Sequence, residues 1–161
     1  MPLLLRTVRQ NRWYKDQASA WLEKADVPAD PIGDLSTSQN RLSVWLVAAD
    51  RSNIERIVRA VAVTRDKIES TGYVLFDSAL LSDVGTSAET VPGKTPDEAA
   101  NDWHRDLVDL SGNKLVALTR AILTNGESDT ILKKRLRELV LSGIQQKELP
   151  EKLQSKLGAS L

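Results

Sequence analysis

Residues 88–95, "AETVPGKT", match the loose form of the Walker A pattern, in which four residues separate a small residue from Gly-Lys-Thr. A phosphate-binding loop needs free backbone N–H groups and a place directly between a buried strand and a helix. Pro92 removes one such N–H, and the nearest predicted strand ends near Asp77, well before the loop. We therefore interpret Thr95 as the N-cap of a following helix and keep only Lys94 as a candidate ligand-binding residue.

Polar residues that could bind a phosphate or a cation follow each of three predicted strands. If the strands are parallel, their carboxyl ends meet at one edge of the sheet, where open α/β sheets bind ligands. Arginines would hold a phosphate, and paired carboxylates would hold a hard cation such as Mg²⁺. The candidate ligand-binding residues are Arg9, Asn11, Arg12, Asp50, Asp77 and Lys94. In the structural alternative, the aspartates begin turns or cap a helix and the arginines form a solvated edge.

Evidence for catalysis is weak. The chain has no cysteine, which excludes a thiol nucleophile and a disulfide framework. Its single histidine, His104, is expected on the exposed face of a helix beside Asp102 and Asp106, and one histidine is a poor basis for a zinc site. No serine nucleophile elbow or metalloprotease motif is present. The sequence thus predicts no catalytic residue, no metal and no cofactor, and favours a protein that is not an enzyme.

The first fifteen residues are basic, with three arginines and a lysine and no acid. Within them, "RTVRQNRWYK" interleaves cations with Trp13 and Tyr14, a pattern that could contact phosphates and stack on single-stranded nucleic acid. The alternative is that the aromatic residues are core and the cations form the wet side of their helix. We favour that alternative, because it is the usual arrangement of an amphipathic helix, and the zero net charge of the chain does not indicate a uniformly basic nucleic-acid binder.

The bulk properties are those of a globular domain. The chain has 161 residues, of which 41% are hydrophobic and 27% charged, enough to bury a core of its own. No apolar run is long enough to cross a membrane, and "MPLLLRTVRQ" reverses the charge order of a secretory signal. We expect a cytoplasmic protein that does not contact the membrane.

The elements that must position the candidate residues alternate between strand and helix over residues 1–77. Apolar runs predict strands over residues 2–8, 42–49 and 73–76. Apolar residues at helical spacing predict helices over residues 11–25 and 52–72, the second with Ser52 and Glu55 in capping-box register. Strand, helix and strand in succession predict a βαβαβ core. A long loop then covers residues 78–95, and three or four helices fill residues 96–161.

These patterns predict one domain over residues 1–161, of the α/β class, with a small three-stranded mainly parallel sheet followed by helices. The alternative is a mainly α protein in which only residues 42–49 and 73–76 pair. For function, we expect a cytoplasmic, non-catalytic binding or regulatory module that acts through a protein partner or by forming a homo-oligomer. Two alternatives remain: an enzyme acting on a phosphate-containing ligand at the strand ends, and a nucleic-acid accessory protein that uses the basic N-terminus.

Overall fold

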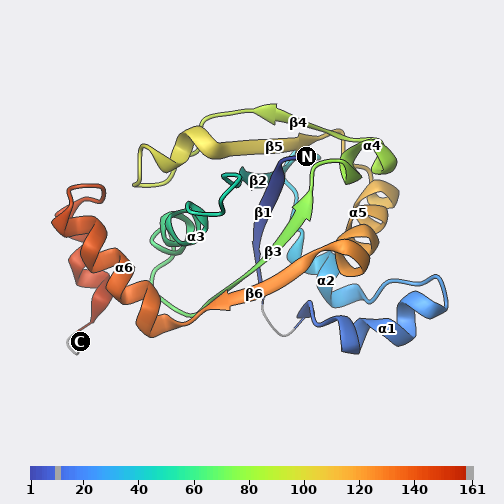
Figure 1. The fold of residues 1–161 in the computed structure, drawn as a ribbon, viewed down its shortest axis with the longest axis horizontal. Helices are drawn as coiled ribbons and strands as arrows, with labels where there is room; N and C mark the ends of the chain where they lie inside the picture. The colour runs from blue at the N-terminus through green and yellow to red at the C-terminus, as the bar shows by residue number, and fades with distance from the viewer. Residues whose placement is uncertain (10–11, 159–161) are drawn as a thin grey trace.

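The centre of the molecule is a six-stranded antiparallel sheet. The computed structural model describes residues 1–9 and 12–158. In the sheet the strands follow the order β4-β5-β2-β1-β3-β6, and every neighbouring pair is antiparallel (Figure 1). Their bounds are β1 (Leu3–Val8), β2 (Leu42–Leu46), β3 (Thr71–Asp77), β4 (Ser87–Thr90), β5 (His104–Val108) and β6 (Glu127–Ile131).

The predicted three-stranded, mainly parallel sheet is therefore wrong, and so is the two-stranded alternative. Strands β2 and β3 do run in the same direction, with the helix α3 (Ile54–Ala62) between them in the chain. They are not neighbours, however, because β1 lies between them and runs antiparallel to both. An apolar run shows that both faces of a strand are covered, but it carries no information on the direction or identity of the neighbouring strand.

Three strands lie where the sequence predicts a loop or helices. Strand β4 falls in the predicted loop, and β5 and β6 fall in the predicted helical part. All four residues of β4 are exposed, and β6 is exposed over its first three residues, so neither has the apolar alternation of a half-buried strand. Both are edge strands, and edge strands are commonly short and polar.

Helices cover both faces of the sheet (Figure 1). One face carries α3, α6 (Lys133–Gln145) and the 3₁₀ helices η2 (Ala100–Trp103) and η3 (Glu151–Leu157). The other carries α1 (Lys15–Glu23), α2 (Ala29–Asp34), α4 (Leu80–Val84) and α5 (Gly112–Asn125). Within β1, Leu5 joins the first hydrophobic cluster, whereas Leu4 and Val8 join the second. The alternation of side chains along one strand thus supplies both cores.

None of the helices in the described part of the chain combines the length and apolar character that a membrane span requires.

The helices also differ in detail from their predicted bounds. Helix α3 begins at Ile54 and ends at Ala62, ten residues before the predicted stop at residue 72. Its N-cap is Asn53, whose amide holds the preceding segment by accepting from Ala48 N–H and donating to the Leu46 carbonyl.

Candidate functional site

The antiparallel sheet separates the residues that were predicted to converge. Val8, at the end of β1, pairs with Gly72 near the start of β3, whereas Leu3 pairs with Asp77 at the end of β3. The chain that follows β1 therefore lies at the opposite end of the sheet from the chain that follows β2 or β3. Arg9 and Arg12 lie at one end, Asp50 and Asp77 lie at the other, and Asn11 lies outside the described residues.

Asp50 and Asp77 have local structural partners. The exposed Asp50 accepts a hydrogen bond from Ser52 N–H at 3.0 Å, and bonding to Ser52 holds the pKa of this carboxyl below its usual value. Asp77 accepts from Ala79 N–H at 2.8 Å. Both aspartates therefore order the turn that follows their strand, as the structural alternative expects. Their role in ligand binding stays a prediction.

Arg9 and Arg12 instead belong to a pocket that collects four arginines, which we name the arginine pocket. It has a volume of about 580 Å³ and lies where the end of β1, the end of α2, the start of β3 and the segment after α3 meet. Its lining residues are Arg6, Thr7, Val8, Arg9, Arg12, Gly33, Asp34, Ser36, Arg65, Ser70 and Gly72. Four arginines and one aspartate leave the described lining with a formal charge of +3.

Asp34 compensates only one edge of this pocket. Its Oδ1 pairs with Arg12 Nη1 at 3.1 Å, and its Oδ2 accepts from Arg9 N–H and from Trp13 Nε1–H, each at 2.9 Å. Only 5% of the Asp34 side chain is exposed. Both carboxylate oxygens are therefore occupied by neighbouring donors, and the carboxylate holds the segment after β1 against α2.

Neither Arg6 nor Arg65 forms an ion pair with Asp34. Arg6 donates from Nη1 to the Ser43 carbonyl at 2.9 Å, but its buried Nε has no hydrogen-bond partner among the described residues. Burial lowers the pKa of Arg6, and the charge of Arg65 lowers it further against the opposing effect of Asp34. No ion pair joins either arginine to a carboxylate within residues 1–9 and 12–158. A guanidinium stays protonated at neutral pH, so the pocket holds partly desolvated positive charge.

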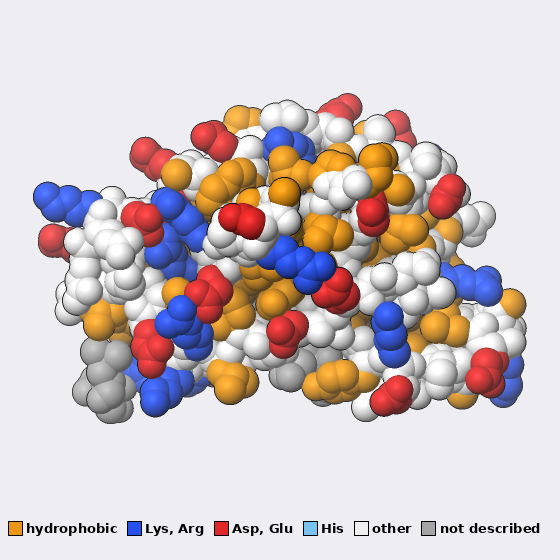
Figure 2. Space-filling view, in the orientation of Figure 1, with side chains coloured by type: hydrophobic (Ala, Val, Ile, Leu, Met, Phe, Trp, Pro, Cys, Tyr) orange, Lys and Arg blue, Asp and Glu red, His pale blue; other side chains and the backbone are white. Residues whose placement is uncertain are grey.

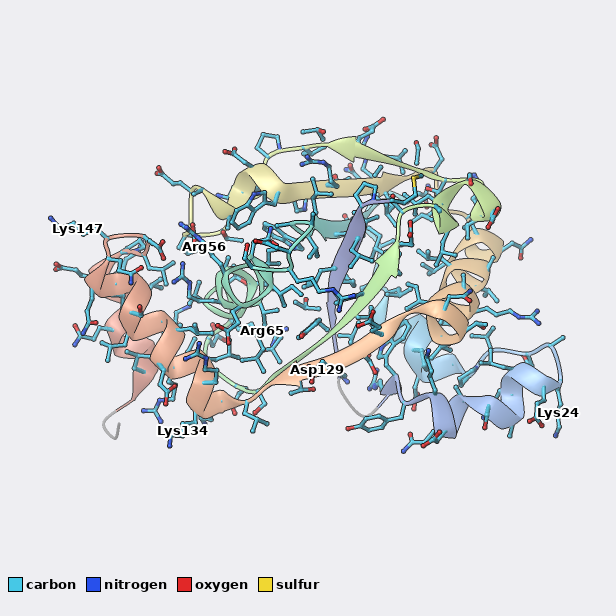
Figure 3. The ribbon with its side chains drawn as sticks, viewed as in Figure 1. Lys24, Arg56, Arg65, Asp129, Lys134 and Lys147 are labelled. Atoms are coloured by element: carbon cyan, nitrogen blue, oxygen red, sulfur yellow. The ribbon has the colours of Figure 1, made fainter. Side chains whose placement is uncertain are left out.

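Arg65 lies on the side of the pocket formed by the segment that follows α3 (Figure 3). Its side chain as a whole is exposed, yet partial burial of the guanidinium still lowers its pKa. Nη1 donates to Thr71 Oγ1 at 3.0 Å, which orients the guanidinium toward the start of β3. The geometry of the pocket suits an anion with several oxygen atoms, because guanidinium groups bind carboxylate and phosphate through paired hydrogen bonds.

The prediction of an exposed helical histidine is wrong. His104 is the first residue of β5, only 9% exposed, and pairs in register with Trp45 of β2. The two rings meet edge to face with centroids 5.0 Å apart. Nδ1 lies 2.8 Å from the Val91 carbonyl oxygen and Nε2 lies 3.6 Å from Asp106 Oδ1. The spacing of Asp102 and Asp106 around His104 is compatible with an exposed helix face. His104 is buried because it packs against its cross-strand partner Trp45, which is distant in sequence.

The loop that matches the Walker pattern borders a second cavity, which we name the histidine cavity. Its volume is about 400 Å³, and residues 91–95 line it together with His104, Asp106 and Trp45. In the loop, Gly93 N–H donates to the Asn101 carbonyl and Thr95 N–H donates to Asn101 Oδ1, each at 2.9 Å. These two N–H groups are therefore committed to η2 and do not point at a phosphate. Lys94 is exposed and lines this cavity, four residues after β4 ends at Thr90.

A third cavity, of about 670 Å³, is lined in part by a compensated network that we name the acid–base cluster. Asp97, fully buried, binds Arg56 Nε at 2.9 Å and Arg59 Nη2 at 2.6 Å. Glu148 binds the same two guanidiniums, at 2.9 and 2.7 Å. Figure 3 shows Arg56 between α3 and the far end of α6. Burial raises the pKa of Asp97, but hydrogen bonds from both arginines outweigh burial and hold that pKa below its usual value.

Sequence reasoning missed Arg6, Asp34 and Arg65. A signal existed for Arg6, because a charged residue inside the apolar run "LLLRTV" needs either a partner or a ligand. Asp34 ends α2 and Arg65 follows α3, and both look like ordinary solvated residues in the sequence. Only the folded chain brings them beside the end of β1.

The fold and the site together define an antiparallel α/β protein with a cationic pocket at one end of its sheet. In comparisons with protein families, curated proteins and solved structures, no match to this chain was found.

Proposed function

We propose that this protein is a cytoplasmic, non-catalytic binding module that holds an anionic group, such as a phosphate, in the arginine pocket. The observation that carries the proposal is the uncompensated charge: four arginines face one aspartate, and that aspartate is already bound by Arg12, Arg9 and Trp13. Arg6 is a desolvated cation with no ion-pair partner among the described residues, which is unfavourable, so a bound anion would relieve a cost that the folded chain carries.

The lining of the pocket supports binding rather than chemistry. A general base must be free to take a proton from a ligand. Asp34 is the only carboxylate among the described residues that line the pocket, and donors occupy both of its oxygens. His104 lines the neighbouring histidine cavity instead. We therefore prefer a binding module to an enzyme acting on a phosphate-containing ligand.

The nucleic-acid alternative has less support than it had from sequence. Trp13, one of the two aromatic residues in the basic segment, is 2% exposed and its indole N–H is bonded to Asp34, so it does not offer a stacking face. On the face drawn in Figure 2, acidic and basic side chains alternate and form no broad cationic surface. A localised pocket fits a small anionic group better than an extended polyanion.

Phosphate-dependent stabilisation tests the proposal. We expect potassium phosphate to raise the melting temperature, relative to potassium chloride of the same ionic strength. At a concentration ten times the dissociation constant, linkage predicts about 1.4 kcal/mol, or a rise of about 3–5 °C for a chain of this size. Arg65→Gln should abolish the rise. Arg135→Gln removes an exposed arginine of α6 that pairs with Glu55 of α3, and this matched control should retain the rise.

Two results would contradict the proposal. One is the absence of any phosphate effect in the wild-type protein. The other is an equal effect in Arg65→Gln and the wild type, because phosphate would then bind elsewhere. Isothermal titration with phosphate, at two salt concentrations, gives an independent measure of the same binding.

A contact with a protein partner or a second copy of the chain is the second candidate, favoured by the aromatic residues around α1. Trp21 is 49% exposed and Tyr14 is 42% exposed, and large exposed aromatic side chains are enriched at interfaces. We expect a homodimer in sedimentation velocity, and we expect Trp21→Gln to shift the distribution toward the monomer. A wild-type protein that sediments as a monomer at all concentrations would exclude self-association through this helix.

A further inference from the structure

The arginine pocket and the histidine cavity adjoin each other. Arg6 and Thr7 of β1 line both of them. From Arg6 a short series of contacts leads into the histidine cavity: Arg6 Nη1 binds the Ser43 carbonyl at 2.9 Å, and Ser43 Oγ lies 3.4 Å from Asp106 Oδ1. The two spaces therefore share a wall formed by Arg6 and Thr7. Both volumes, about 580 and 400 Å³, are in the range of small-molecule sites.

The histidine cavity offers both donors, such as Lys94, and acceptors, such as the Asp106 carboxylate. The Val91 carbonyl can only accept, so His104 Nδ1 carries the hydrogen in their 2.8 Å contact. In the neutral ring Nε2 is then an acceptor, and it lies 3.6 Å from Asp106 Oδ1, too far for a direct hydrogen bond. The other contacts of Asp106, to Ser43 and Arg41, are long at 3.4 Å each. Asp106 and His104 Nε2 can therefore each accept a further hydrogen bond, which suits the hydroxyl groups of a ligand.

The cavity does not offer an aromatic stacking face. Trp45 is only 5% exposed: its ring packs against that of His104 at an interplanar angle of 75°, and Gly93 lies beside its Cη2 atom. A nucleobase or another flat aromatic group would need such a face. Hydroxyl groups need only donors and acceptors, which Asp106, His104, Ser43 and the exposed Lys94 provide.

We propose that the two cavities form one bipartite site for a small phosphorylated polyol, such as a sugar phosphate. The phosphate lies against Arg6 and Arg65, and the sugar hydroxyls lie against Asp106 and His104. This inference rests on the proposed function, because it uses the arginine pocket as the phosphate half of the site.

Titration calorimetry with three probes tests the bipartite site: inorganic phosphate, glucose 6-phosphate and phenyl phosphate. We expect glucose 6-phosphate to bind at least about tenfold more tightly than inorganic phosphate, since hydrogen bonds to a charged carboxylate contribute that much or more. Phenyl phosphate, which has an aromatic group and no hydroxyl, should bind no better than inorganic phosphate.

Substitution of Asp106 tests whether the tighter binding of glucose 6-phosphate comes from contacts in the histidine cavity. Asp106→Ala should reduce the preference for glucose 6-phosphate to near onefold and leave the affinity for inorganic phosphate unchanged. Glu89→Ala is the matched control, because Glu89 also pairs with Arg41 but lines neither cavity, and it should keep the preference. If Asp106→Ala does not fold, His104→Gln is the second test, because it changes the other acceptor and should also reduce the preference for glucose 6-phosphate.

The outcomes separate the two proposals. If inorganic phosphate binds and glucose 6-phosphate binds no more tightly, the bipartite site is wrong and the proposed function stands. If none of the three probes binds, both fall. A preference that survives in both Asp106→Ala and His104→Gln, or an equal gain with phenyl phosphate, would also overturn the polyol assignment.

Discussion

The acid–base cluster and the arginine pocket are both built around arginines, but they differ in how the charge is balanced. In the acid–base cluster, two guanidiniums meet two carboxylates, and each carboxylate binds both guanidiniums. In the arginine pocket, four arginines meet one carboxylate, and Arg6 keeps a buried Nε without a partner among the described residues. A balanced buried cluster loses stability when one of its charges is removed, whereas a cluster with excess charge can bind a counter-ion.

The positions of the two clusters fit this difference. Asp97 precedes η2 and Glu148 lies between α6 and η3, so the acid–base cluster joins both segments to α3. The arginine pocket instead lies at the open end of the sheet, where Arg65 and Arg9 remain exposed. Charge removed from the first cluster should reduce stability, and charge removed from the second should reduce ligand binding. Four predictions test this contrast.

The largest effect is expected from Asp97→Asn. Removal of this charge leaves Arg59, which is 4% exposed, short of one of its two counter-ions. Breaking a buried ion pair on one side typically costs about 3–5 kcal/mol. We expect a loss of that size in the free energy of unfolding measured with urea. Asp50→Asn, an exposed turn aspartate, should leave the urea midpoint nearly unchanged; a comparable loss in both variants would refute the contrast.

The same carboxylate should make stability depend on pH. The pKa of Asp97 is lowered in the folded state, so its contribution is complete above the unfolded pKa of about 4 and is lost as the pH falls toward the folded pKa. We expect the free energy of unfolding of the wild type to decrease as the pH falls below about 4. In Asp97→Asn this decrease should be smaller; parallel pH profiles for the two proteins would contradict the assignment.

Arg65→Gln should weaken phosphate binding without reducing stability, the opposite of what we expect for Asp97→Asn. The substitution removes a cation from a region of excess positive charge, and it breaks no ion pair among the described residues. Without phosphate, we expect the melting temperature to stay the same or to rise. With phosphate, the variant should melt below the wild type. A clear loss of stability in phosphate-free buffer would show that Arg65 is structural.

The smallest effect is expected from exposed ion pairs that belong to neither cluster. Arg135 and Glu55 form a bidentate contact on the surface, with about half of each side chain exposed. Solvent screens such a pair, and its net contribution is usually small. Arg135→Gln should change neither the melting temperature nor phosphate binding by more than experimental error. A marked change in either would show that exposure is a poor guide to the role of these arginines.

Local sequence patterns predicted the central strands and the helices α1 and α3, whereas α2 falls in a segment predicted as a loop. The apolar runs at residues 42–49 and 73–76 contain β2 and most of β3, and "LLLRTV" is β1. These segments are buried on one or both faces, so their composition alone indicates a strand. The edge strand β6, "ESDTI", has no such pattern, because solvent contacts most of its side chains. Its strand conformation follows from pairing with β3.

Part of the candidate site was also within reach of the sequence. Arg9 and Arg12 follow a predicted strand and do line a pocket, and Arg6 interrupts an apolar run. Arg65 could not be found in this way, because it enters the pocket only after α3 returns the chain to the start of β3. The predicted grouping of Asp50 and Asp77 with the arginines failed because it assumed parallel strands.

The amino-acid sequence by itself determined which segments are buried and which residues carry charge, since hydrophobicity and side-chain chemistry are local properties. Tertiary structure decided which strand lies beside which, and it inserted β1 between β2 and β3 with the opposite direction. Because of this strand order and direction, Arg6, Arg9 and Arg12 lie toward the opposite end of the sheet from Asp50 and Asp77. Strand pairing depends on hydrogen bonds between segments distant in the chain, so no local pattern contains it.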